Sequence, residues 1–227
     1  MTNIAEILNN DSPGNVVEAW YEANNTPRIH LGLSQIGHKC KRYLWYCHHG
    51  YKQTEIKGRV LRLFNLGNII EDSIVFDLRQ AGYVVHSAQK EVHFEYKGLR
   101  LVGHIDGIVD GLIESSQPHL LEIKSANEKS FKQLLKLGSY EKWNEKYKAQ
   151  VHNYMLGLKL KRCLVIVENK NTSELYTERI RLDKNYIINA LEVVFEAISM
   201  HSPPERSCPR ADWYEAKWCG FWGECFK

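Results

Sequence analysis

Three ionisable residues near the middle of the chain have the types and the spacing to hold a metal ion. Glu122 and Lys124 lie in the apolar segment HLLEIKSA, and Asp106 lies in GHIDG. Alternate residues of a strand share one face, so Glu122 and Lys124 are expected to project together, and Asp106 joins them if its strand is a neighbour. Buried carboxylates are costly, and a divalent cation is the usual compensation, with the lysine placed to orient or activate water. An isolated Glu-x-Lys in a strand is more often a structural ion pair, because the pattern is common by chance.

Helical patterns surround this part of the chain. Residues 59–81 repeat apolar side chains with the period of an amphipathic helix, and residues 128–137, 143–159 and 184–200 predict further helices. The apolar positions of the first are Leu63, Leu66, Ile70, Ile74 and Leu78. A shorter helix is expected from an N-cap at Ser34 to about Trp45.

Strand patterns lie between these helices. Residues 91–96 and 99–109 alternate as a hairpin around Lys97 and Gly98, and residues 119–125 make a third strand. Two more strands are expected at 163–167 and 174–181. The order predicts an α/β fold with a mixed central β-sheet flanked by helices.

The composition is that of a globular protein, and the length allows one large domain or two small ones. The chain has 227 residues, 44% hydrophobic and 25% charged, with a net charge of +3. We divide it into an N-terminal arm and helical segment carrying Cys40 (1–58), a core (59–182), and a C-terminal helix and cysteine-containing tail packing on the same domain (183–227). It has no long uncharged apolar stretch and no export signal pattern at the start, so we expect a cytoplasmic protein with no membrane partner.

The pattern Asp-x15-Glu-x-Lys resembles the catalytic motif of the PD-(D/E)XK nuclease superfamily. Two further motifs resemble its RecB-like exonuclease branch, which includes CRISPR-adaptation and phage recombination exonucleases. They are GNIIE, residues 67–71, and QVHNY, residues 150–154, and they occur in the order of that branch. The resemblance covers about residues 32–225, with Ile105 where the superfamily has its proline.

This resemblance implies a restriction-endonuclease-like core and a metal-dependent deoxyribonuclease. The expected activity is exonucleolytic hydrolysis of DNA phosphodiester bonds in recombination, repair or phage DNA processing, in a bacterial or phage-infected cell. The implied ligands of Mg²⁺ or Mn²⁺ are Glu71, Asp106, Glu122 and the Ile123 carbonyl, and the implied catalytic residues are Asp106, Glu122, Lys124, Gln150 and Tyr154. Two alternatives stay open: a non-catalytic DNA-binding or scaffold module with this fold, and a structure-specific endonuclease.

The cysteines suggest a second metal group. Some RecB-like nucleases bind a 4Fe-4S cluster through one cysteine before the core and three after it, and Cys40, Cys219 and Cys225 match three of these ligands. Ala216 occupies the expected fourth position, for which Cys208 could substitute. A 4Fe-4S cluster, a zinc ion and an incomplete site are the three alternatives. Cys47 and Cys163 fall on apolar patterns and are expected in the core.

The expected partner is DNA, single-stranded or with single-stranded ends. Cationic side chains that could contact phosphates are clustered along the chain beside aromatic residues that could stack on bases. The cations are Lys39, Lys41, Arg42, Lys52, Lys57, Arg59, Arg62, Lys129, Lys132, Lys136, Lys142, Lys146 and Lys148, and the aromatics are Tyr43, Trp45, Tyr51 and Trp143. No nucleotide-binding P-loop motif occurs, so unwinding of DNA would need a partner protein, such as one for recombination or annealing.

Overall fold

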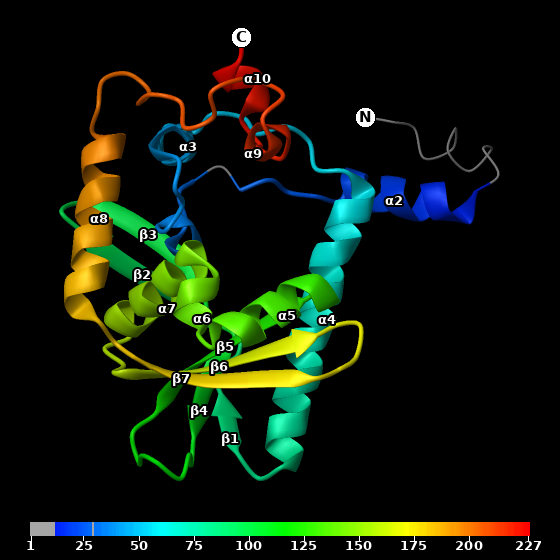
Figure 1. Ribbon diagram of the computed structural model, residues 1–227, viewed down its shortest axis with the longest axis vertical. Helices are drawn as coiled ribbons and strands as arrows, with labels where there is room; N and C mark the ends of the chain where they lie inside the picture. The colour runs from blue at the N-terminus through cyan, green and yellow to red at the C-terminus, as the bar shows by residue number, and fades with distance from the viewer. Residues whose placement is uncertain (1–11, 29) are drawn as a thin grey trace.

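The computed structural model describes residues 12–28 and 30–227 (Figure 1). The prediction for the N-terminal arm concerns in part residues 1–11, which lie outside the described residues. The helices are α2 (Pro13–Ala23), η1 (Leu33–Gln35, a 3₁₀ turn), α3 (Lys41–His48), α4 (Gly58–Gln80), α5 (Glu128–Leu137), α6 (Tyr140–Trp143), α7 (Glu145–Gly157), α8 (Lys184–Ile198), α9 (Tyr214–Lys217) and α10 (Trp222–Cys225). The strands are β1 (Val84–His86), β2 (Glu91–Tyr96), β3 (Leu99–His104), β4 (Gly107–Asp110), β5 (His119–Ala126), β6 (Arg162–Asn169) and β7 (Leu175–Arg181).

A five-stranded mixed sheet forms the centre of the molecule, in the order β1-β4-β5-β6-β7. Strands β5 and β6 are parallel, and the other neighbours are antiparallel. Strands β2 and β3 form a separate antiparallel hairpin, whose turn uses the left-handed conformations of Lys97 and Gly98. The predicted mixed sheet flanked by helices is therefore confirmed.

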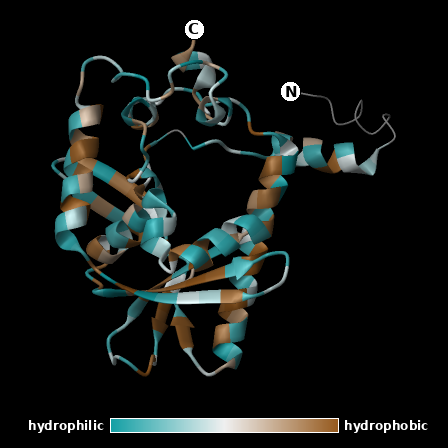
Figure 2. Ribbon diagram, viewed as in Figure 1, coloured by the Kyte–Doolittle hydropathy of each residue, from teal (hydrophilic) through white to brown (hydrophobic). Residues whose placement is uncertain are grey.

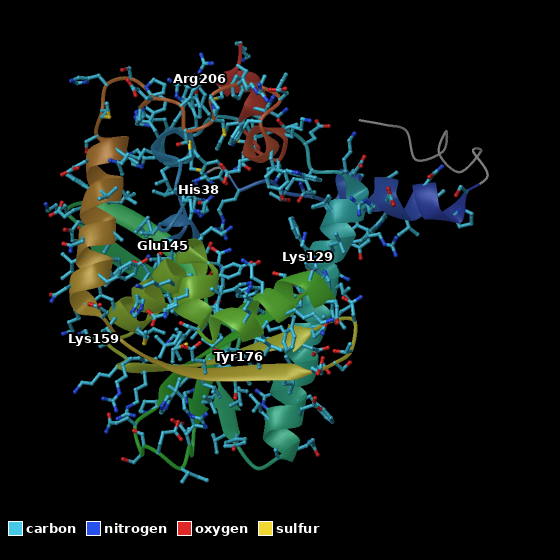
Figure 3. The ribbon with its side chains drawn as sticks, viewed as in Figure 1. His38, Lys129, Glu145, Lys159, Tyr176 and Arg206 are labelled. Atoms are coloured by element: carbon cyan, nitrogen blue, oxygen red, sulfur yellow. The ribbon has the colours of Figure 1, made fainter. Side chains whose placement is uncertain are left out.

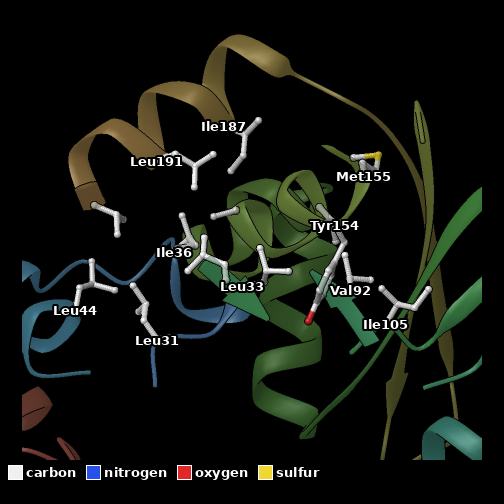
Figure 4. Packing of buried hydrophobic residues seen from close by; sticks show 14 of the residues in the cluster. Leu31, Leu33, Ile36, Leu44, Val92, Ile105, Tyr154, Met155, Ile187 and Leu191 are labelled. Atoms are coloured by element: carbon white, nitrogen blue, oxygen red, sulfur yellow. The ribbon is translucent and has the colours of Figure 1, made fainter. Parts of the chain in front are cut away.

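The two faces of the sheet belong to different apolar clusters because alternate residues of each strand point to opposite sides. Leu120 on β5 packs with α7 and α8 in the larger cluster, which includes Tyr154 and Leu191 (Figure 4). Leu121 and Ile123 pack on the other face, against α4. Figure 2 shows hydrophobic residues in several strands of the sheet and on parts of α4 and α8, where they alternate with hydrophilic residues. Strand β5 is thus covered on both sides, which explains its apolar character.

The predicted strand 99–109 is in fact two strands. β3 pairs with β2, whereas β4 pairs with β1 and β5, and Ile105 and Asp106 occupy the break between them. The chain must leave the hairpin and enter the central sheet at this point, so it cannot continue as one strand. Asp106 therefore stands at the edge of the ladder, next to β5.

The predicted helix from Ser34 to Trp45 was wrong. Its apolar stripe is divided between η1 and α3, separated by a bend around Gly37. A Cβ at Gly37 would lie 2.6 Å from the carbonyl oxygen of Glu145, so this bend packs directly on the start of α7. Tertiary packing overrides the helical pattern here.

Helix α4 follows the predicted range, but its apolar stripe is only partly buried. Ile70 and Ile74 pack on the sheet, whereas Leu63 and Leu66 are 42% and 40% exposed. The first half of α4 extends away from the sheet and contacts α2, where Gly58 N donates to Glu22 Oε1 at 2.7 Å (Figure 1). The division of the chain at residues 58 and 182 stays a prediction. No described helix is both long and apolar enough to cross a membrane.

Candidate active site

Asp106, Glu122 and Lys124 lie together on the face of the sheet that α7 covers. The Lys124 ammonium forms an ion pair with Glu122 Oε1. Asp106 Oδ2 accepts a hydrogen bond from the Ile123 N–H at 2.6 Å, so its side chain continues the pairing of β4 with β5 where the backbone ladder ends. The sequence therefore predicted correctly which of these side chains share a face.

The carboxylates of the site are held in an environment that disfavours their charge. Glu122 is fully buried, and its pKa is raised to about 7, because burial, Asp106 and Glu71 raise it by more than Lys124 lowers it. Burial and the neighbouring Asp106 likewise raise the pKa of Glu71, on α4, to about 7, while Gln89 and Lys124 oppose this. Three carboxylates are thus close enough to repel one another: Glu71 on α4, Asp106 between β3 and β4, and Glu122 on β5.

Lys124 is the only cation among the described residues that shift the pKa values of Glu71 and Glu122. Burial by itself lowers the pKa of Lys124, but Glu122 and Asp106 raise it above its ordinary value overall. The ammonium is therefore protonated at neutral pH. It also lies 5.7 Å from the ring centroid of Tyr147, which adds a weak attraction for the cation.

The site has the chemistry to hold a divalent cation. Among the described residues, Glu122 Oε1 has only its ion pair with Lys124, and Glu122 Oε2 has no hydrogen-bond partner. Three neighbouring carboxylates that share one ammonium, with one of the carboxylates fully buried, fit a hard cation with oxygen ligands. The Ile123 carbonyl, the fourth predicted ligand, accepts a hydrogen bond from Lys124 Nζ at 3.1 Å. Across residues 12–28 and 30–227, no group of three or more His, Cys, Asp and Glu side chains is already arranged around a common metal position.

Gln150 and Tyr154 lie on one face of α7, one turn apart, and both are buried. Burial raises the pKa of Tyr154 above its usual range, and Glu122 and Asp106 raise it further, so the phenol is near the carboxylates and neutral. A Cβ at Gly103 would lie 2.5 Å from Tyr154 Oη, so the absence of a side chain at Gly103 makes room for this ring. Figure 4 shows the hydroxyl pointing away from α8.

Two residues near the site, Gln89 and Tyr147, were missed by the sequence interpretation, and a third, Lys146, was expected only as a DNA contact. Gln89 donates a hydrogen bond from Nε2 to Glu71 Oε1 and has a left-handed backbone, φ 55°. Lys146 has a pKa lowered by burial and by Lys124. Tyr147 lies against Lys124. None belongs to a recognisable motif, and only the fold places them here.

The four cysteines proposed as ligands come from the two ends of the described chain and lie near one another. Burial raises the pKa of Cys219, as do the thiols of Cys40, Cys225 and Cys208. All four are half-buried and free. The tail is fastened to the N-terminal segment by backbone contacts such as Thr54 N–H to Gly220 O, 2.7 Å (Figure 1). Cys47 and Cys163 are buried in the core, as predicted.

Several residues expected to contact DNA have structural roles instead. Arg42 donates from Nε to Pro204 O at 2.5 Å, which ties α3 to the C-terminal segment. Trp45 is only 5% exposed and donates to Met200 O at 2.9 Å, so its ring is not accessible for stacking on a base. Lys132 pairs with Glu128 along α5. Lys148 forms an ion pair with Glu141, whereas Lys129 on α5 lies at the surface without an ion pair among the described residues (Figure 3).

Comparison with solved structures places the chain in a known fold. It is similar to an alkaline exonuclease (LHK-Exo) from Laribacter hongkongensis, with a TM-score of 0.51 and 16% identity over 80% of this chain and 91% of that one. The same exonuclease in complex with dAMP matches over the same shares, with 16% identity and a TM-score of 0.49. No protein-family model and no curated protein sequence matches the chain. The resemblance that the motifs indicated is therefore confirmed at the level of the fold.

Proposed function

From the fold it shares with an alkaline exonuclease, we propose that this chain is a metal-dependent deoxyribonuclease that removes nucleotides from DNA ends. The observation that carries the proposal is the fully buried Glu122 carboxylate, which has one ammonium, that of Lys124, as its ion-pair partner in the described chain and lies near two further carboxylates, Asp106 and Glu71. A cluster of this kind is expensive to fold and is typical of functional sites rather than of stable cores. A non-catalytic DNA-binding module would have no need of such a cluster of buried charges.

Asp106, Glu122 and Glu71 would hold Mg²⁺ or Mn²⁺, with the Ile123 carbonyl as a further ligand. The ion would polarise the scissile phosphate and lower the pKa of a bound water. The Ile123 carbonyl oxygen now accepts one hydrogen bond, from Lys124 Nζ, and its second lone pair would be the one to coordinate the ion.

The protein's own donors would then act on the phosphodiester. Because Lys124 stays protonated, it would orient the attacking water and stabilise negative charge on the phosphate, and it would not abstract a proton. Tyr154, a neutral phenol, would donate a hydrogen bond to the phosphate, and Gln150 would position the strand. A role in recombination, repair or phage DNA processing is the setting we infer for such an enzyme.

The exonuclease assignment is tested with substrates that differ only in their ends. We expect linear single- or double-stranded DNA to be degraded with Mg²⁺ or Mn²⁺ and to survive with EDTA, while covalently closed circular DNA of the same sequence stays intact. Cleavage of the circle would favour the endonuclease alternative. Degradation that EDTA does not affect, or no degradation of any substrate with either ion, would exclude the metal-dependent nuclease.

We also propose that Cys40, Cys208, Cys219 and Cys225 hold a 4Fe-4S cluster that joins the C-terminal tail to the segment around α3. Thiolates are the ligands that iron-sulfur clusters and zinc prefer. Burial raises the pKa of Cys208 and of Cys219, and the neighbouring thiols of Cys40 and Cys225 contribute to both shifts, which supports a common site. Such a cluster would have a structural role because it lies on segments outside the central sheet.

Anaerobically purified protein is expected to be brown and to contain iron and acid-labile sulfide in equal amounts. The variant Cys208→Ser should lose most of both and show a lower Tm, whereas Cys47→Ala, a cysteine outside the group, should keep them. Zinc in place of iron would support the zinc alternative. Protein free of both metals would show that the site is incomplete.

A further inference from the structure

A basic hollow lies at the end of the central sheet where β5 and β6 begin and β7 ends. It has a volume of about 340 Å³ and is lined by Glu114, His119, Arg162, Arg179, Ile180 and Arg181. A second hollow of about 720 Å³ shares Arg162 and Arg181 with it and continues along Lys161, Leu182, Asp183, Lys184 and Asn185. The two together, called here the β7 groove, hold five lysine and arginine side chains against two carboxylates. Lys159, labelled in Figure 3, lies in the turn just before the groove.

Two arginines of the groove carry positive charges that no acidic side chain of the described chain neutralises. Arg162 and Arg181 are directly opposite each other on β6 and β7, and Arg179 follows on the same face of β7. Like charges at opposite positions of an antiparallel pair are destabilising. Arg179 pairs with Glu114, but within the described chain neither Arg162 nor Arg181 forms an ion pair. An anion between them would convert this repulsion into attraction.

His119 is a second, independent sign of a missing ligand. Its side chain is 1% exposed and lines the groove. Nδ1 donates to the Gln117 carbonyl at 3.0 Å, since that oxygen can only accept. Nε2 has no hydrogen-bond partner among the described residues, and the Glu114 Oε1 atom, at 3.9 Å, is too far away to be one. In the neutral ring Nε2 is an acceptor, and burial, together with Arg162 and Arg179, lowers the pKa of His119. An anion bound beside these arginines would offset their effect and favour the doubly protonated ring, whose Nε2–H could donate to the anion.

The groove is separate from the candidate active site. His119 shares its face of β5 with Leu121 and Ile123, whereas Glu122 and Lys124 lie on the other face. Arg162 is likewise on the face of Leu164 and Ile166. The sheet itself therefore lies between the groove and the carboxylates.

We propose that the β7 groove binds phosphate groups, and that its natural ligand is the backbone of a nucleic acid strand passing the side of the sheet opposite the carboxylates. Guanidinium groups form bidentate hydrogen bonds with phosphate oxygens, which favours phosphate over a simple halide. Two joined hollows with cations along both are longer than one phosphate requires, which favours successive phosphates over a single one. This site goes beyond the proposed hydrolysis, because phosphate binding there requires no catalysis.

The first test measures binding of a fluorescein-labelled single-stranded oligonucleotide by anisotropy, in EDTA so that the DNA stays intact. Arg162→Gln/Arg181→Gln is expected to bind about tenfold more weakly than the wild type at 0.1 M salt, with a slope of log affinity against log salt that is smaller by about 1 to 2. The matched control, Arg100→Gln/Lys170→Gln, removes the same charge from other surfaces and should behave as the wild type. Equal affinities and slopes for all three proteins, or the same loss in both variants, would overturn the proposal.

The second test uses the wild type, so it does not depend on how a variant folds. Phenylglyoxal modifies accessible arginines, and peptide mass mapping reports each position. We expect inorganic phosphate, dAMP and the oligonucleotide to protect Arg162 and Arg181 but leave Arg100 reactive. Protection by the oligonucleotide at concentrations well below those needed for phosphate identifies the nucleic acid backbone, and equal concentrations identify a small phosphate ligand. No protection by any of the three would refute the site, whether or not the protein hydrolyses DNA.

Discussion

Replacing Asp106 with asparagine is expected to slow DNA hydrolysis by about 10³-fold while leaving the fold intact. The asparagine carbonyl can accept the Ile123 N–H bond that Asp106 Oδ2 accepts now, so the junction of β4 and β5 keeps its geometry. What is lost is the charge, and with it a metal ligand and part of the field around the scissile phosphate. Initial rates on end-labelled linear DNA, measured with saturating Mg²⁺, would report the change.

The matched control is Asp110→Asn, four residues further along β4. Asp110 is paired with His86 at the surface and does not belong to the carboxylate cluster, so this variant should hydrolyse DNA at the wild-type rate. Thermal unfolding of both variants would show whether folding is affected. If Asp106→Asn retained a rate within a few-fold of the wild type, the assignment of Asp106 to catalysis would be wrong.

The second large effect concerns the stability of the metal-free protein, which should fall as pH rises from about 5 to 8. The pKa values of Glu71 and Glu122 are raised from 4.5 to about 7 in the folded state, so between these values the folded protein binds protons that the unfolded chain has already released. Their stabilising contribution is complete below pH 4.5 and is lost above about pH 7. For fully buried Glu122 alone this amounts to about 3 kcal/mol.

Denaturant titrations in EDTA at pH 5 and pH 8 would measure this difference. In Glu122→Gln the pH dependence should shrink by about 3 kcal/mol, because the titrating group is gone, whereas Glu95→Gln, an exposed control, should keep the wild-type dependence. Mg²⁺ should stabilise the wild type more at pH 8 than at pH 5, since it binds the ionised carboxylates. A metal-free protein whose stability rises over this range in parallel with Glu122→Gln would contradict the predicted burial of these charges.

The elements with a strong local period followed from the sequence. The alternation in residues 119–126 predicted β5, and the sharing of a face by Glu122 and Lys124 followed because side chains of a strand alternate strictly. The turn at Lys97 and Gly98, and the helix over 58–80, are likewise local properties, since they depend on backbone preference and on a repeat of a few residues. The types and order of the motif residues indicated the chemistry and the fold together.

Other features depended on contacts that no local pattern contains. The break at Asp106 arises because two sheets need the same segment of chain, and the bend at Gly37 arises because α7 packs there. Trp45 and Arg42 are both plausible DNA contacts by residue type. Their side chains instead donate hydrogen bonds to backbone carbonyl groups more than 150 residues away in the sequence. The β7 groove is of the same kind, because Arg162 and Arg181 become opposite neighbours only through strand pairing.

The sequence by itself thus determined which residue types could do chemistry and which of them share a strand or a helix face, because these are short-range consequences of backbone geometry. Only the tertiary structure decided how deeply these side chains are buried and which charged groups lie near them. It surrounds Glu122 completely, brings Glu71 within range of Asp106, and leaves Arg162 and Arg181 facing each other at the surface. Burial and charge proximity are long-range properties of packing, and they set the pKa values and the unmet interactions from which the catalytic site and the β7 groove are inferred.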